Sequence, residues 1–354
     1  MEASTGSSRS HEAIRGVVLE EGERIRKAQK YELQREYALE GSYSGEPHDV
    51  VYIEADGTQI HHQLSNRKKG KGLEVKVGIC YTGKCPRYRG GSGKAKLLEN
   101  KYIYLDITPG PVFMEDMSLV AEREVGLSQA KHVIVGGDGA AWIRKGIAMN
   151  FAGAHYKLCD YHLNEQVTTA LSGMADVKSR VKSHLGKYNT EGALVALWDG
   201  AVSCTDSKQF DKLSKLYKYI DSNREGIWDV SQFGNGEVGV VIERLGAVEN
   251  TVDNAVADRF KKHGFCWSEG GARSLLKIQQ ALLNGRWDHW WYEERNKPIK
   301  VDRGAITPFS ASEVNKGSSN KTVMEEIPLP CFHGPDQSKP WVKALKGMIE
   351  INML

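Results

Sequence analysis

Hydrophobic positions follow two rhythms along this chain, and each rhythm predicts a kind of element. Short apolar runs rich in β-branched residues predict strands, because such side chains fit a pleated surface and the runs are too short for isolated helices. The predicted strands cover residues 50–55 continuing through 58–63, then 73–81, 101–107, 132–135 and 154–158. Helices predicted between the later strands cover residues 109–125, which Gly126 can end, and 140–150.

The order of these elements indicates the fold class. Three hairpin-linked strands followed by alternating helices and strands predict an α/β protein with a mixed sheet. A ribonuclease-H-like architecture, in which helices flank a mixed five-stranded sheet, fits this order best. After the fifth strand, residues 163–236 carry helical stripes and no strand signal, so we expect an all-helical insertion before the last core helix. In that last helix Val252, Val256 and Phe260 recur every four residues, which predicts one face packed on the sheet, with Gly264 ending the helix.

The predicted organisation has four parts. Residues 1–48 form an amphipathic helical arm and a linker. Residues 49–162 and 237–295 form the core, 163–236 the helical insertion, and 296–354 a tail that packs on the core or is partly disordered. Trp287, Trp290 and Trp291 are expected to anchor that tail by packing, and the alternative is a platform on which nucleic-acid bases stack.

Two aspartates stand where predicted strands end. Asp138 follows the strand that ends in Gly136-Gly137, and Asp56 follows the apolar run VVYIEA. The carboxyl ends of strands are where open α/β sheets place their chemistry. For Asp138 alone, an equally simple explanation is that it caps the helix behind it. Two such aspartates on neighbouring strands could lie side by side, which is the oxygen-rich pairing that hard divalent cations prefer.

A third carboxylate precedes the last core helix. Glu249 lies one turn before Val252 on the same side, so it should point toward the sheet, which is costly unless something binds it. The simpler explanation is an acid that stabilises the first turn of the helix, and Asp253, Glu243 and Glu237 are rival candidates. Three converging carboxylates suit phosphoryl transfer at a nucleic-acid phosphodiester, in which two Mg²⁺ ions assist the attacking and leaving oxygens.

The distribution of charge adds a candidate partner. The net charge is only +3, but eleven Lys or Arg residues stand between Arg67 and Lys101 against Glu74 and Glu99 alone. Two glycine-rich segments there are expected to be hairpin loops, which either are solvated tips or contact a phosphate backbone next to Asp56. The candidate DNA-binding residues are Arg67, Lys68, Lys69, Arg87, Arg89, Lys94 and Lys96.

Several classes of protein are disfavoured. Composition is ordinary for a globular protein, with 40% apolar and 26% charged residues, and no stretch is long and apolar enough to span a membrane. Six scattered cysteines indicate reduced thiols and no structural zinc, so a cytoplasmic, nucleoid-associated protein is expected. A phosphate-binding loop around Lys84 is disfavoured because Cys85 replaces the Ser or Thr that holds Mg²⁺ and no helix pattern follows.

Four blocks resemble a known family. YIEADGTQIHHQ, VGGDGAAWIRKG, the Cys159-x-x-His162 pair and AVEN…WSEGGARSLLKI are similar to bacterial insertion-sequence transposases, specifically the Lre-type group of the Mutator-like Asp-Asp-Glu superfamily, once catalogued only as an uncharacterised family. The resemblance covers roughly residues 49–283. It implies a DNA transposase whose Asp56, Asp138 and Glu249 bind two Mg²⁺ ions, with Mn²⁺ as a substitute, and whose Cys159 and His162 support that site.

The resemblance also implies partners, and departures from it leave alternatives open. Transposon ends and target DNA would be the partners, with a homo-oligomer forming on DNA. Fewer than fifty residues precede the core, so reduced or lost recognition of DNA ends is expected. The alternatives are a truncated or degenerate transposase descendant that only binds DNA, and a hydrolytic ribonuclease-H-like nuclease that does not join strands.

Overall fold

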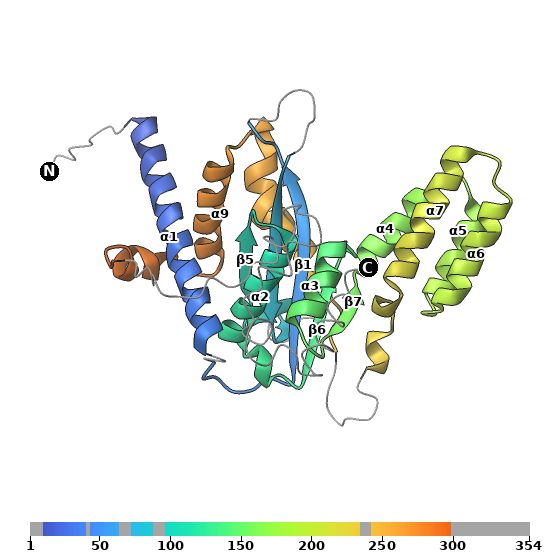
Figure 1. The fold of residues 1–354 in the computed structure, drawn as a ribbon, viewed down its shortest axis with the longest axis horizontal. Helices are drawn as coiled ribbons and strands as arrows, with labels where there is room; N and C mark the ends of the chain where they lie inside the picture. Colours follow the sequence, from blue (N-terminus) through green and yellow to red (C-terminus); the bar gives the residue numbers. More distant parts are fainter. Residues whose placement is uncertain (1–9, 40–42, 64–71, 88–95, 234–241, 299–354) are drawn as a thin grey trace, which may run out of the picture. The chain divides into compact units, whose positions relative to one another are not determined.

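A mixed five-stranded sheet with helices on both faces forms the centre of the structure (Figure 1). The computed structural model describes residues 10–39, 43–63, 72–87, 96–233 and 242–298. The sheet has the order β5-β2-β1-β6-β7. Its strands are β1 (Val50–Ile60), β2 (Leu73–Tyr81), β5 (Tyr102–Asp106), β6 (His132–Gly137) and β7 (His155–Leu158). Because β1 pairs antiparallel with β2 and parallel with β6, the predicted mixed sheet is confirmed.

The remaining elements surround this sheet. A separate hairpin consists of β3 (Gly83–Pro86) and β4 (Lys96–Glu99). The helices are α1 (His11–Leu39), α2 (Gly110–Val125), α3 (Ala141–Asn150), α4 (Asp160–Ala170), α5 (Ala175–Leu185), α6 (Thr190–Val202), α7 (Ser207–Ser222), α8 (Ala247–Val252), α9 (Glu269–Leu283) and α10 (Trp287–His289). Two π-helical segments, η4 (Asp253–Lys261) and η6 (Trp290–Glu294), continue α8 and α10. Within the described ranges, none of the helices combines the length and apolar character that crossing a membrane requires.

The two faces of the sheet bury different helices, as alternating side chains of a strand require. Val51 and Ile53 of β1 pack with α2 and α3. Val50 and Tyr52 point to the opposite face and pack with α8, η4 and α9. By the same alternation Asp56 lies on the face of α8, two pleats beyond Tyr52.

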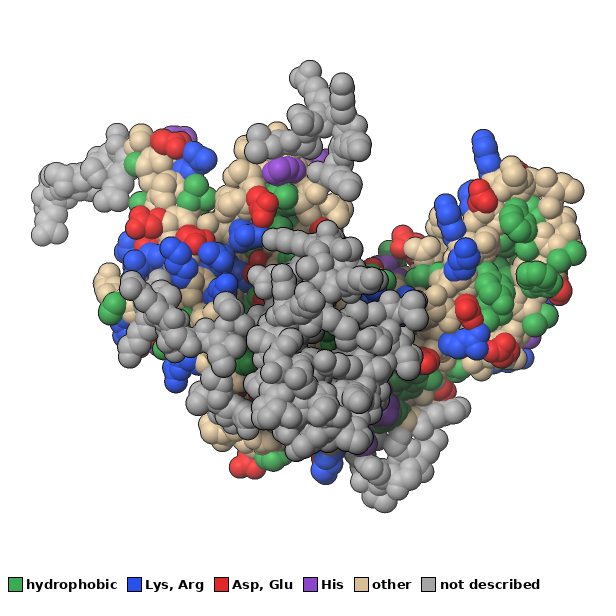
Figure 2. All heavy atoms as spheres, in the orientation of Figure 1, with side chains coloured by type: hydrophobic (Ala, Val, Ile, Leu, Met, Phe, Trp, Pro, Cys, Tyr) green, Lys and Arg blue, Asp and Glu red, His purple; other side chains and the backbone are tan. Residues whose placement is uncertain are grey.

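The helical insertion has an apolar core of its own. Helices α4 to α7 bury Val167, Val181, Leu197 and Leu213 around Leu158 of β7, so the predicted all-helical region is observed. It begins earlier than its apolar stripes indicated, because α4 starts at Asp160. Figure 2 shows hydrophobic side chains on the surface of this part of the molecule. In α6, the exposed hydrophobic residues are Val195, Trp198 and Val202.

Three local expectations need correction or refinement. The first strand does not stop at Asp56, because antiparallel pairing with β2 carries β1 through to Ile60; only the parallel pairing with β6 ends at Ala55. The N-terminal arm is one continuous helix, α1. Val252, Val256 and Phe260 are spaced four residues apart, and most of this stretch lies in η4. A π-helix has more residues per turn than the 3.6 of an α-helix, so it suits this spacing. Gly264 adopts a φ of 68°, as expected where that segment ends.

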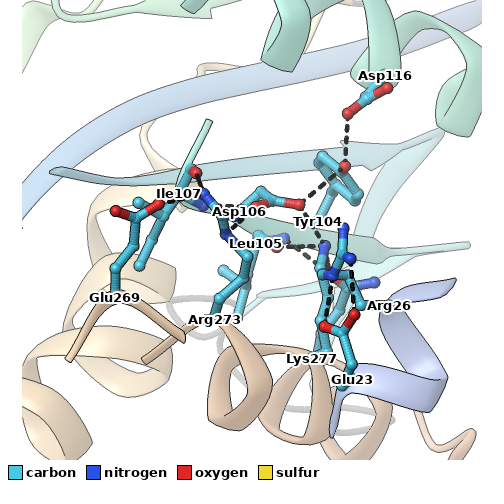
Figure 3. Close-up of polar contacts among 11 residues, drawn as sticks. Glu23, Arg26, Tyr104, Leu105, Asp106, Ile107, Asp116, Glu269, Arg273 and Lys277 are labelled. Atoms are coloured by element: carbon cyan, nitrogen blue, oxygen red, sulfur yellow. Dashed lines mark hydrogen bonds and ion pairs between the residues drawn. The ribbon is translucent and has the colours of Figure 1, made fainter. Parts of the chain in front are cut away.

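Polar contacts join α9 to the outer strand of the sheet (Figure 3). Lys277, only 1% exposed, places its Nζ 2.9 Å from the Asp106 carboxylate and donates to the Leu105 carbonyl at 2.7 Å. Arg273 donates to the Ile107 carbonyl at 2.6 Å. Burial opposes ionisation of Asp106, but the charge and hydrogen bond of Lys277, the Ile107 N–H and the charge of Arg273 together outweigh it and lower the pKa of that carboxyl. This ion pair is therefore a charged contact inside the protein.

Two amides continue the same arrangement along β5. Asn284 accepts from the Ile103 N–H and donates to the Ile103 carbonyl, both at 2.8 Å. Gln280 accepts from the Leu105 N–H at 2.9 Å. Side chains of α9 thus satisfy the backbone groups that β5 turns away from β2.

The tryptophans after α9 pack, as predicted, but on helices. Trp290 is 9% exposed and lies in a cluster with Ile25 of α1 and Ile278 and Ala281 of α9. Trp287 stacks on Trp291 with ring centroids 5.5 Å apart. Of the tail that they were expected to anchor, residues 296–354, all but 296–298 lie outside the described residues.

Candidate active site

Two aspartates emerge side by side where β1 and β6 stop pairing. Ala55 is the partner of Gly137 in the parallel register, so Asp56 and Asp138 occupy the next position on each chain. Asp56 is 8% exposed, and its Oδ1 accepts from the Gly57 N–H at 2.7 Å. Burial, followed by the charge of Asp138, raises the pKa of Asp56 to about 6. The sequence prediction that these carboxylates are neighbours is therefore observed.

Asp138 contacts both the helix behind it and the helical insertion. Its Oδ1 accepts from the Ala140 N–H at 2.8 Å, but Ala140 is itself the N-cap of α3 and no side chain in the described chain caps that helix, so the capping explanation is not observed. Tyr219 of α7 donates to the Asp138 backbone carbonyl at 2.8 Å. Gly139 has a φ of 90°, a conformation that favours glycine, and a side chain there would meet Tyr219. This turn fixes the direction of the Asp138 side chain without excluding a second partner for it.

Glu249 reaches the same region from α8. Cys159, at the start of α4, places its Sγ 2.6 Å from Glu249 Oε1 and donates to it. Nδ1 of His162, in the first turn of α4, lies 3.6 Å from the same oxygen. Burial, together with the hydrogen bond to Glu249, raises the pKa of Cys159 to about 12, so the thiol is protonated at neutral pH. The charge of Glu249 also contributes to the raised pKa of Asp56, which ties the glutamate to the aspartate pair.

The rival acids do not join this group. Glu243 pairs with Lys96 at 2.7 Å, and Asp253 is exposed on η4. Glu237 lies outside the described residues. Among the named candidates, Glu249 is the one whose charge acts on Asp56.

The donor set and two buried atoms without partners fit a metal ion. Within the part of the chain that the structure describes, Glu249 Oε2 and His162 Nδ1 are buried and lack a hydrogen-bond partner. The carboxylates of Asp56, Asp138 and Glu249 offer oxygen ligands, which suit Mg²⁺ or Mn²⁺. Cys159, His162 and Glu249 also offer atoms within 4.8 Å of one another, but sulfur and nitrogen suit softer ions. The chemistry of a hard divalent cation therefore favours the three carboxylates, whereas the ligand atoms found within 4.8 Å of one another among the described residues are those of Cys159, His162 and Glu249.

The predicted basic loops are only partly described. Arg67, Lys68, Lys69, Arg89 and Lys94 lie outside the described residues. Arg87 is exposed at the end of the β3–β4 hairpin, and Lys96 pairs with Glu243. The hairpin itself was predicted correctly for this second glycine-rich segment. Contact of these residues with DNA stays a prediction.

The structure also explains the phosphate-loop lookalike around Lys84. Gly83 to Cys85 belong to β3, and the next described element is a strand, β4, rather than a helix. Lys84 donates to the Arg244 carbonyl, on the segment that leads into α8. Burial lowers the pKa of Lys84, whereas the nearby carboxylates of Glu54 and Glu243 raise it. Lys84 therefore joins β3 to the segment that leads into α8, and the loop lacks the architecture of a nucleotide-binding loop.

Sequence reasoning missed one carboxylate in this region. Glu54 is 2% exposed inside β1, two residues before Asp56. The only sequence signal is a charged residue in an otherwise apolar run. Its contacts, described below, run to the start of α8.

Proteins of similar sequence carry a family name and no stated activity. A UPF0236 protein in the vanSb 3′ region of Streptococcus gallolyticus is 24% identical over 351 residues, 97% of this chain and 72% of that protein. Two UPF0236 proteins of Caldanaerobacter subterraneus subsp. tengcongensis are each 22% identical over 263 residues, 74% of this chain. The chain spans 52% and 49% of their lengths, about half of each.

Likeness to solved structures is slight. The Drosophila P element transposase strand transfer complex gives a TM-score of 0.20 at 8% identity, covering 71% of this chain and 68% of that one. NurA bound to dAMP and manganese gives 0.10 at 17% identity, covering 79% of this chain and 64% of that one. Scores this low establish no common fold.

The family assignment rests on sequence over most of the chain. The pattern that defines the uncharacterised protein family UPF0236 matches residues 3–296. This range includes β1, β6 and α8, the elements that carry the three candidate carboxylates. The chain therefore belongs to the UPF0236 family.

Proposed function

We propose that this protein is the DNA transposase of an insertion sequence, cutting and joining DNA phosphodiesters on a ribonuclease-H-like fold. The observation that supports the proposal is the parallel register of β1 and β6, which places Asp56 beside Asp138, with the charge of Glu249 on α8 acting on Asp56. The family resemblance of the sequence blocks supports the same activity. A homo-oligomer that holds transposon ends and target DNA belongs to this proposal.

The chain's own residues have separable tasks in this proposal. Asp56 and Asp138 would bind both metal ions between them, and Glu249 would complete the shell of one. Two Mg²⁺ ions, when bound, activate the attacking hydroxyl and stabilise the leaving oxygen. The Cys159 thiol donates to Glu249 Oε1, which orients that carboxylate and leaves Oε2 for a metal.

His162 would help hold the same oxygen of that carboxylate. Its Nδ1 faces Glu249 Oε1 and has no closer partner in the described chain. Exposed basic residues on the β3–β4 hairpin, including Arg87, would hold the DNA backbone beside the acids.

The first test separates metal binding from cleavage. Manganese binding is titrated by electron paramagnetic resonance, and nicking of supercoiled plasmid is measured with Mg²⁺ or Mn²⁺. Asp138→Asn should reduce cleavage by more than about 100-fold, because losing a ligand costs more than losing a group that only orients one. Asp199→Asn, which removes an exposed carboxylate on α6, is the matched control and should behave as wild type. An Asp138→Asn variant that cuts like wild type would exclude this site.

Joining is tested with DNA that already carries free 3′-hydroxyl ends. Insertion of such ends into a plasmid supports a transposase, whereas cutting without joining indicates a hydrolytic nuclease. DNA binding without either activity indicates a DNA-binding remnant.

The basic hairpin is tested by the salt dependence of DNA binding. Affinity for DNA falls as salt rises, with a slope set by the number of phosphates neutralised. Replacing Arg87, Arg89, Lys94 and Lys96 with alanine should make this slope shallower by roughly 3 to 4, if each residue neutralises one phosphate. An unchanged slope would show that these residues face away from DNA.

A further inference from the structure

Glu54 uses its carboxylate to bind the beginning of α8. Its oxygens accept from the backbone N–H groups of Gly246 at 2.8 Å, Ala247 at 2.9 Å and Val248 at 3.3 Å. The Tyr81 hydroxyl of β2 donates to the same carboxylate at 2.8 Å. Four donors therefore meet one side chain that is 2% exposed.

This arrangement satisfies both partners. The first N–H groups of a helix have no partner within the helix, and no side chain of the α8 segment itself caps them. A buried carboxylate is costly unless hydrogen bonds compensate it, and a helix N-terminus also favours negative charge. Burial raises the pKa of Glu54, whereas the Tyr81 hydroxyl and the α8 amides lower it. Glu54 thus supplies from β1 the cap that α8 lacks.

The neighbouring tyrosines hold the same segment. The rings of Tyr52 and Tyr81 stack with centroids 4.9 Å apart and an interplanar angle of 9°. The Tyr52 hydroxyl accepts from the Glu243 N–H at 2.9 Å. The chain that enters α8 is therefore attached to β1 at two points, one through Tyr52 and one through Glu54.

We propose that Glu54 is a positioning residue that sets the place of Glu249 relative to Asp56. Glu54 and Asp56 are two residues apart on one face of β1, and Glu249 lies in the first turn of α8. One carboxylate therefore ties the strand that bears the first acid to the helix that bears the third. Glu54 acts through the backbone of α8, since its oxygens are engaged by amides and a hydroxyl. The consequence for catalysis rests on the proposed function; the attachment of α8 to β1 does not.

The test is Glu54→Gln, which keeps the size of the side chain but replaces one accepting oxygen with an amide that faces N–H donors. Hydrogen exchange at residues 246–248 should accelerate by at least about tenfold, as loss of charge-assisted hydrogen bonds implies. Manganese affinity should fall, and the turnover rate for DNA cleavage should drop about tenfold with KM for DNA unchanged. A crystal structure of the variant should show Glu249 displaced from Asp56.

Two further variants keep the test decisive. Glu124→Gln makes the same chemical change at a glutamate on α2 that pairs with Arg123 and Arg286, and it should leave exchange in α8 unchanged. Tyr81→Phe removes one donor to Glu54 and should give a smaller effect in the same direction, even if Glu54→Gln does not fold.

The outcomes separate this inference from the proposed function. Unchanged exchange at residues 246–248 in Glu54→Gln, with Glu249 undisplaced, would overturn the positioning role whatever the activity. A wild-type protein that binds Mn²⁺ but cuts no DNA would refute the proposed function, and the exchange and displacement results would still decide the role of Glu54.

Discussion

Replacing Asp56 with asparagine should stabilise the metal-free protein while removing its response to metal. Asparagine has nearly the same shape, and its Oδ1 can still accept from the Gly57 N–H that Asp56 uses. What the substitution removes is a negative charge that is buried and lies beside Asp138 and Glu249. Burying that charge lowers the stability of the folded wild-type protein when no metal is bound, and the variant is free of this penalty.

The magnitude follows from the pKa of Asp56. Burial and the neighbouring acids raise it from the ordinary value of 3.8 to about 6. Between these pH values the folded state binds more protons than the unfolded state, so the free energy of unfolding falls as pH rises. Each pH unit of pKa shift is worth about 1.4 kcal/mol, so the penalty reaches about 3 kcal/mol above pH 6 and vanishes below pH 4.

The assay is urea denaturation of wild type and Asp56→Asn at pH 4 and pH 8, with EDTA and then with Mn²⁺. In EDTA at pH 8 the variant should be more stable by about 3 kcal/mol, and at pH 4 the difference should disappear. Saturating Mn²⁺ should stabilise wild type and leave the variant nearly unchanged. Asp49→Asn, at an exposed carboxylate just before β1 that pairs with Lys131, is the control and should show neither effect. Equal stabilities in EDTA at pH 8, or equal responses to Mn²⁺, would refute the reasoning.

Two further predictions concern the packing of α1 and α9. Gly22→Ala should destabilise the fold by roughly 1–3 kcal/mol, because its Cβ would lie 2.2 Å from the Ser274 carbonyl oxygen of α9. Gly16→Ala in the same helix meets nothing and should stabilise by about 0.5–1 kcal/mol; thermal denaturation that gives both variants the same sign would contradict the packing of α1. Lys277→Met should cost about 3–5 kcal/mol by leaving Asp106 as a buried charge with only the more distant Arg273 to pair with it, and adding Asp106→Asn should recover much of it. A double variant no more stable in urea than the single one would show that the cost comes from lost packing.

Local sequence patterns were enough to predict the strands of the sheet and to single out the three candidate acids. Apolar runs that end in Gly or Asp define strands by their own composition, and parallel pairing then makes Asp56 and Asp138 neighbours. The apolar stripe behind Glu249 gave its direction in the same way. The register of β1 and β6 places Asp56 beside Asp138, while the convergence of all three acids and their catalytic role stay predictions.

Contacts between backbone groups and distant side chains could not be predicted. Glu54 binds the amides of residues 246–248, and an amide N–H carries no information about side-chain identity. The strand predicted over residues 50–55 and continuing through 58–63 is one element because pairing with β2 carries it through Asp56-Gly57, and pairing across those two residues was not predicted. The packing of Trp290 on α1 was not predicted for the same reason, since α1 lies far away in the sequence.

The side chains of α9 that bind β5 have a consequence for how the protein can associate. An outer strand normally presents free N–H and C=O groups to which a strand from another molecule can add. Here the side chains of Asn284 and Gln280 already hydrogen-bond backbone groups of Ile103 and Leu105 with which a sixth strand would pair. Sheet extension between copies, a common start of aggregation, is blocked along this edge. Any assembly that includes this side of the molecule must therefore form through side-chain surfaces of α1 and α9.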